Sequence, residues 1–160
     1  MKLLQKLLAI LILLIISIGS YAQANWDQIY TDMVETVQLH PPGDILGDPF
    51  IVLGDNNSKL VLSFDGFGAE FFQMEYKLIH CDADWEESDL LHNEYIEGFE
   101  EAFIDNFEFS INTKQPYIHY RQLIPHNNMR IYRSGNYVLK VYPEDQEDKP
   151  IFIKRLMVID

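Results

Sequence analysis

Cysteine is nearly absent from this sequence. Cys81 is the only cysteine among 160 residues, so no disulfide can form within the chain. Small exported domains often depend on disulfides because their cores are small. A chain of this length can bury a sizeable core, and two Trp, nine Tyr and ten Phe residues are available for it. We therefore expect one domain that its hydrophobic core holds together.

Basic residues are also scarce. Twelve Lys and Arg residues stand against 25 Asp and Glu residues, which gives a formal net charge of −13 at pH 7. Nucleic acids and anionic membrane surfaces repel a protein of this charge. The composition therefore argues against both classes of partner.

No apolar run is long enough to cross a bilayer. Residues 7–18 are apolar apart from one serine, whereas a spanning helix needs roughly 20 such residues. Lys2 and Lys6 give the chain a positive start, and the small residues at 20–24 suit cleavage by a signal peptidase. We predict that residues 1–24 are a cleaved Sec-type signal peptide and that residues 25–160 form an exported domain. A membrane anchor is the alternative.

Past residue 33 the sequence shows short apolar runs or alternation of period two, each ended by Gly, Pro, Asn or Asp. This pattern is typical of many short strands. The expected strands are residues 34–39, 50–53, 59–64, 72–81, 107–112, 117–124, 134–141 and 151–159. They predict an all-β fold, an antiparallel immunoglobulin-like β-sandwich of about seven to eight strands. The Cys-Trp-Cys signature of antibody domains is missing.

One long acidic excursion interrupts these strands. Residues 78–113 contain eleven Asp and Glu residues and no Lys or Arg. Leu91, Tyr95, Phe99 and Phe103 recur every four residues, which suits a helix, yet Gly98 weakens that interpretation. We expect an excursion with about one helical turn. Connections of this length in a compact domain usually serve a function.

The start of the excursion resembles a metal site only in part. Asp82, Asp84 and Glu86 have the spacing that opens a calcium loop. The sixth position, which needs Gly, is Glu87, and the twelfth, which needs a bidentate Glu, is Asn93. The histidines also lack the spacing of a zinc site. We predict a solvated loop without metal or cofactor, and a calcium ion remains the alternative.

The neighbouring His80 and Cys81 do not form a catalytic pair. A reactive thiolate needs a nearby positive charge or a histidine base, but acids follow Cys81. Adjacent residues of a strand also point to opposite faces of the sheet. We expect His80 to be a hydrogen-bonded histidine at the edge of the core. Ile79 and Cys81 then share the outer face and need a cover, and no residue stands out as catalytic.

Five stretches carry a family resemblance. In order, they read "VQLHPPG", "LVLSFDGF", "YKLIHCDADWEESDLLHNEYIEGF", "FEFSINTKQPYIHYRQLIPHNNM" and "SGNYVLKVY". With them, the chain from Val34 to Ile159 resembles the N-terminal domain of the plug protein of the type IX secretion system. The resemblance implies a periplasmic, non-enzymatic protein that docks on the outer-membrane translocon barrel and closes its pore while no substrate passes. Plug proteins of this family are longer, so the resemblance implies that the chain corresponds to the front part of that architecture, as a truncated or split form.

The excursion is the expected docking surface under this resemblance. Docking energy concentrates in a few buried aromatic anchors, and acidic charge can steer the approach to a basic rim. The candidate surface comprises acidic and aromatic side chains, namely Asp82, Asp84, Trp85, Glu86, Glu87, Tyr95, Phe99 and Phe103. The alternative is that these aromatics pin the excursion to the sandwich.

Two other functions fit the expected fold. A secreted immunoglobulin-like module could bind glycan or peptide, and it would need an exposed aromatic platform such as Trp85. A calcium-dependent or hydrolytic accessory domain is the other alternative, although no pair of carboxylates is singled out by an apolar setting.

Overall fold

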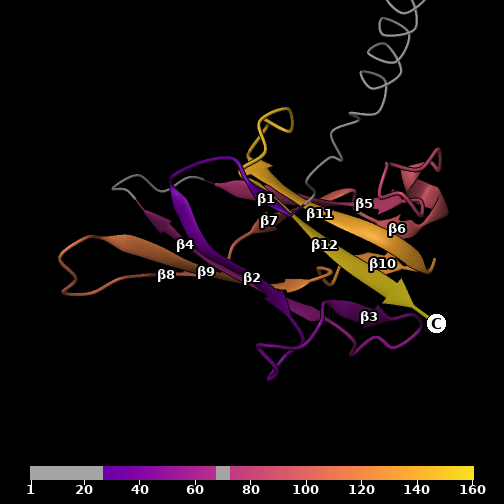
Figure 1. Cartoon of the computed structure of the whole chain (residues 1–160), viewed down its shortest axis with the longest axis horizontal. Coiled ribbons are helices and arrows are strands. Elements are labelled where there is room, and N and C mark those ends of the chain that lie inside the picture. Colours follow the sequence, from indigo (N-terminus) through magenta and orange to yellow (C-terminus); the bar gives the residue numbers. More distant parts are fainter. Residues whose placement is uncertain (1–26, 68–72) are drawn as a thin grey trace, which may run out of the picture.

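Twelve strands make up most of the regular structure in the computed structural model, which describes residues 27–67 and 73–160. They form a six-stranded sheet, a four-stranded sheet and a separate pair of short strands (Figure 1). The described residues contain no α-helix and one 3₁₀ turn, η1 (His92–Glu94). The predicted signal peptide, residues 1–24, lies outside the described residues.

The six-stranded sheet contains the last strand of the chain near its centre. Its strands follow the order β1 (Gln28–Ile29), β12 (Phe152–Ile159), β11 (Gly135–Pro143), β5 (Met74–Cys81) and β7 (Glu101–Ile104). These neighbours are antiparallel. The sixth strand, β3 (Phe50–Val52), pairs in parallel with the end of β12, so the C-terminus lies beside β3 (Figure 1).

The four-stranded sheet is antiparallel throughout. Its order is β2 (Val34–His40), β4 (Leu60–Phe67), β9 (Tyr117–Ile124) and β8 (Phe107–Phe109). A bulge shifts the register of β2 between Glu35 and Gln38, where Thr36 has a φ of 58°. The separate pair consists of β6 (Ile96–Gly98) and β10 (Met129–Ile131).

Aromatic rings join the two sheets in the core. Phe64 of β4 stacks on Tyr120 of β9 at 4.8 Å and meets Phe152 of β12 edge-on at 5.0 Å. Tyr76 of β5 is fully buried, and its hydroxyl accepts a hydrogen bond of 2.7 Å from the backbone N–H of His126. The core therefore contains the alternate, inward-facing residues of both sheets, as a sandwich requires.

The predicted all-β sandwich is confirmed. Each of the eight expected strands overlaps an observed one, and the expected inner face of β5 is correct, because Tyr76 and Leu78 are fully buried. The predicted end of β4 at Phe64 is wrong, because residues 65–67 continue to pair with β9. Gly66 allows this continuation, since a Cβ at that position would lie only 3.1 Å from the Tyr120 ring.

The acidic excursion is more ordered than its sequence indicates. Residues 96–98, 101–104 and 107–109 return to the fold as β6, β7 and β8, so the irregular part is short. The expected helical turn is η1. The apolar residues that recur every four positions do not lie on a longer helix, because Gly98 adopts a φ of 109° and the chain extends on both sides of it.

Candidate functional site

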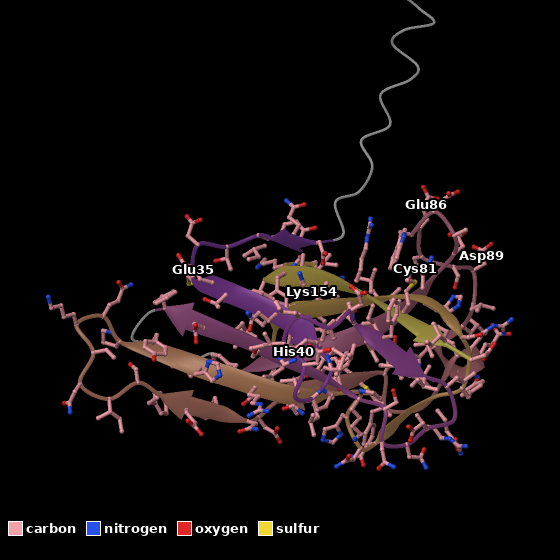
Figure 2. All side chains as sticks on the ribbon, turned by 60° about the horizontal axis from the view of Figure 1, so that its bottom comes forward. Glu35, His40, Cys81, Glu86, Asp89 and Lys154 are labelled. Atoms are coloured by element: carbon pink, nitrogen blue, oxygen red, sulfur yellow. The ribbon has the colours of Figure 1, made fainter. Side chains whose placement is uncertain are left out.

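The loop of residues 82–91, called the acidic loop below, leaves the end of β5 as a closed turn. The backbone N–H of Asp82 donates to the carbonyl of Glu86 at 3.0 Å, and that of Trp85 donates to the carbonyl of Asp82 at 3.1 Å. Asn136 of β11 donates its side-chain amide to the carbonyl of Asp82 at 2.9 Å. These bonds fix the loop to the six-stranded sheet, and Glu86 and Asp89 project from the body of the fold (Figure 2).

Trp85 has the most unusual geometry in the acidic loop. Its φ is 65°, a left-handed conformation that bulky residues rarely adopt. The ring is half-buried and stacks on the Arg155 guanidinium, 4.5 Å from the ring centroid. The strained backbone thereby directs the indole onto the outer face of the six-stranded sheet, and such strain is often associated with function.

Beneath the acidic loop lies an aliphatic cluster on the outer face of the sheet. It consists of four residues that are at most 8% exposed, Ile79, Cys81, Val138 and Ile153, with Trp85 packed against them. The prediction that Cys81 is a packing residue under the excursion is confirmed. Burial raises the pKa of the Cys81 thiol to about 11, and the charges of Glu87 and Asp82 act in the same direction. The thiol is therefore protonated and unsuited to nucleophilic chemistry.

His80 lies on the opposite face of β5 and has a structural role. Its Nδ1 is 2.8 Å from the Ser88 hydroxyl, and its ring meets the Tyr137 ring edge-on at 5.1 Å. Burial lowers the pKa of His80, so the ring is neutral near pH 7. The prediction of a hydrogen-bonded histidine at the edge of the core, separated from Cys81, is confirmed.

A charged network borders the aliphatic cluster toward β7. Lys77 of β5 and Lys140 of β11 lie directly opposite each other, a pairing that is unfavourable for like charges. Glu147 lies between them, 3.5 Å from Lys77 and 3.3 Å from Lys140, and Glu100 is 2.6 Å from Lys77. Burial alone would lower the pKa of Lys77, but the Glu100 hydrogen bond and the two carboxylate charges raise it. Nearby carboxylates therefore compensate the positive charges of both lysines.

The structure divides the predicted surface into three groups. The acids Asp82, Asp84, Glu86 and Glu87 are exposed on the acidic loop, and Trp85 is half-buried there. Phe99 lies between β6 and β7 and is 62% exposed, whereas Phe103 is 45% exposed on β7, opposite Glu75. Tyr95 is only 5% exposed and belongs to the core. Including Tyr95 in the candidate surface is wrong, because its ring packs against His80 and Tyr137.

Sequence reasoning missed the residues that complete this face from distant strands. Val138 and Ile153 come from β11 and β12, and the turn between these strands adds Asp148 and Pro150 beside the cluster. The sequence did contain a signal for these residues, because both strands have apolar residues at outward-facing positions. The register that places them next to Ile79 is evident only from the sheet.

No group of three metal-ligating side chains is arranged to hold an ion in residues 27–67 and 73–160. The calcium alternative thus gains no support from the geometry of the acidic loop. Within the same ranges, no helix is long and apolar enough to span a membrane.

Comparisons with known proteins complete the description. Residues 34–160 match the family described as the type 9 secretion system plug protein, first domain. A hypothetical protein from Parabacteroides merdae with a known crystal structure is 34% identical, with a TM-score of 0.78. The similarity covers 83% of this chain and 33% of that protein, so the chain spans about a third of its length. None of the curated proteins matches the chain significantly. The family match covers most of the sequence, and the chain therefore belongs to the plug protein family of the type IX secretion system.

Proposed function

We propose that this chain is a periplasmic, non-enzymatic component of the type IX secretion system that docks on the outer-membrane translocon barrel and closes its pore in the resting state. The observation that carries the proposal is the family match over residues 34–160. The signal-like sequence of residues 1–24 supports export to the periplasm. We further propose that residues 25–160 correspond to the first part of a longer plug architecture, in line with the length of the Parabacteroides merdae relative.

The acidic loop is the part of the fold best suited to docking. Asp82, Asp84, Glu86 and Glu87 are exposed on it, so the loop presents a concentrated negative charge. Hydrogen bonds within the loop and from Asn136 restrain its backbone, which reduces the conformational entropy lost when a partner binds. A basic rim on the translocon would attract this loop and orient the plug. Phe99 and Phe103 are further exposed anchors.

The alternative of a glycan-binding module receives less support. A sugar platform requires an open aromatic face, but the Trp85 ring packs on the aliphatic cluster and stacks on Arg155. Catalysis also lacks a supporting observation, because the thiol of Cys81 and the ring of His80 face opposite sides of β5 and are held in structural contacts.

Affinity purification of the tagged chain from native envelopes tests the proposed docking. We expect the translocon barrel to co-purify with the wild-type chain. The double variant Asp84→Lys/Glu86→Lys should recover it roughly tenfold less, because rim charges govern association. The matched control is Glu35→Lys/Glu108→Lys, which makes the same charge change at exposed positions of the four-stranded sheet. Failure of the wild-type chain to recover the barrel would refute the proposed docking function.

A further inference from the structure

Four apolar side chains lie on the outer face of the six-stranded sheet, at the corner where β3 meets the end of β12. Phe50 and Val52 flank Ile51, whose side chain is buried in the core, so both point outward. Met157 and Ile159 take the outward positions of β12 by the same alternation. The parallel register pairs Phe50 with Met157 and Val52 with Ile159. These four side chains, called the corner patch below, therefore adjoin one another on one face.

The corner patch is open to solvent. Phe50 is 37% exposed, and Val52 and Ile159 are each 43% exposed. Met157 is half-buried. The outer face of an antiparallel sheet usually presents polar residues to water, and contiguous exposed apolar side chains mark an interaction surface. The corner patch therefore offers apolar area that a partner can remove from water.

The free edge of β3 is unsuited to the addition of a partner strand. Phe50 and Val52 direct their backbone groups away from β12, since the residues on either side bond to it. The N–H of Val52 donates to the Ser58 hydroxyl at 2.7 Å, and its carbonyl accepts a bond of 3.3 Å from the N–H of Asp55. The N–H of Phe50 donates to the carbonyl of Asp48 at 2.8 Å. The chain thus satisfies most of this edge itself, and a partner must contact the side chains of the corner patch.

A hollow adjoins the corner patch at Val52. It has a volume of about 480 Å³ and lies between residues 51–59 and residues 125–132. Tyr132 on its far side is 44% exposed. A body that covers the corner patch can therefore place a protruding side chain in this hollow, which adds shape to the apolar contact.

The place of the corner patch in the chain identifies what covers it. Residues 34–160 match a first domain of the plug protein family, and the similar Parabacteroides merdae protein is about three times as long as this chain. Asp160 directly follows Ile159 of the corner patch, and the Ser134 hydroxyl donates to its carboxylate at 3.2 Å. The end of β12 lies beside β3 (Figure 1). A domain that follows Asp160 is thus tethered at the corner patch, and a short tether gives it an effective concentration in the millimolar range.

We propose that the second domain of the longer plug architecture packs an apolar surface on the corner patch. This contact rests on the longer architecture proposed above and specifies how its first two domains are joined. Domain interfaces within one chain bury roughly 600 to 1,500 Å², so the corner patch forms the apolar centre of a larger contact. The contact fixes the orientation of the two domains, and the plug then meets the barrel as one body of defined shape.

Thiol labelling tests the contact, because the chain has a low background. Cys81 is 2% exposed and lies under the acidic loop. Val52→Cys is introduced into residues 25–160 alone and into the longer chain from the native reading frame, with any cysteine beyond residue 160 replaced by serine. We expect a maleimide to label Val52→Cys at least about tenfold more slowly in the longer chain, because packing excludes the reagent. Leu123→Cys, at a residue that is 48% exposed on β9 of the other sheet, should react equally in both lengths.

A charge in the corner patch should break the contact. In the longer chain with Val52→Cys, Ile159→Asp should restore the labelling rate of residues 25–160 alone, because an unpaired carboxylate is costly to bury. Ile111→Asp is the matched control. Ile111 is 82% exposed and lies next to the four-stranded sheet, so this variant should leave the protection of Val52→Cys unchanged.

Three results overturn the proposed contact. The first is equal labelling of Val52→Cys in both lengths, and the second is a reading frame that ends directly after Asp160. The third is protection of Val52→Cys in residues 25–160 alone that disappears on dilution, because a second copy then covers the corner patch. Light scattering of residues 25–160 identifies this last case.

Envelope purification separates this contact from the proposed docking function. If Val52→Cys is protected in the longer chain and that chain never recovers the barrel, the docking function fails and the domain contact stands. If the longer chain recovers the barrel and Val52→Cys is labelled equally in both lengths, the domain contact fails and the docking function stands.

Discussion

Replacing Phe64 with alanine lowers the free energy of unfolding by about 3 to 5 kcal/mol. Phe64 is 1% exposed and contacts rings from both sheets, Tyr120 in its own sheet and Phe152 in the opposite one. Alanine leaves a cavity between the sheets and removes both ring contacts. A loss of this size is a large fraction of the stability of a typical domain. Urea denaturation followed by circular dichroism measures it.

An exposed phenylalanine provides the matched control for this substitution. Phe109 is 61% exposed on β8, and its ring meets that of Phe107 edge-on at 5.6 Å. Phe109→Ala should therefore lower the free energy of unfolding by only about 1 kcal/mol. Equal losses for the two variants would show that Phe64 does not join the sheets as described.

Gly98→Ala should destabilise the chain by at least about 2 kcal/mol, the second large effect. A Cβ at this position would lie 1.9 Å from the backbone oxygen of Asn128, and the φ of 109° is itself unfavourable for alanine. Gly98 pairs with Met129 in the short sheet formed by β6 and β10, so relief of the clash must separate these strands. Thermal unfolding and amide exchange of residues 96–98 report the loss.

Gly54→Ala is a control for Gly98→Ala, because it has the unfavourable backbone conformation without the clash. Its φ is 80°, but a Cβ there would meet no atom within 4 Å. Gly54→Ala therefore carries only the conformational cost, about 1 kcal/mol. If Gly98→Ala and Gly54→Ala lose the same stability, the close approach of Asn128 does not exist in solution.

Much of the fold follows from alternation of residue types along single strands. The inward positions of β5 were predictable because Tyr76 and Leu78 repeat with period two, and this pattern reports local geometry directly. The pairing of residues 96–109 was not predictable in the same way. Three short strands there pair with β10, β5 and β9, and their acid-rich sequence does not show which partners they have.

The candidate site was partly predictable for the same reason. The sequence places Ile79 and Cys81 on the outer face and indicates that they need a cover, because alternation within β5 determines this. It could not assign Val138 and Ile153 to the same cluster, since this depends on register across three strands. Tyr95 was misplaced because an aromatic residue among acids can face either the core or solvent, and only packing determines which.

Ion conductance of the purified translocon barrel in a planar bilayer tests the central claim most directly. The account predicts that the wild-type chain, added to the periplasmic side, lowers the conductance of the open barrel. Asp84→Lys/Glu86→Lys should require roughly tenfold more protein for the same reduction, whereas Glu35→Lys/Glu108→Lys should act like the wild type. Unchanged conductance at saturating amounts of the wild-type chain would contradict the claim that this chain closes the pore.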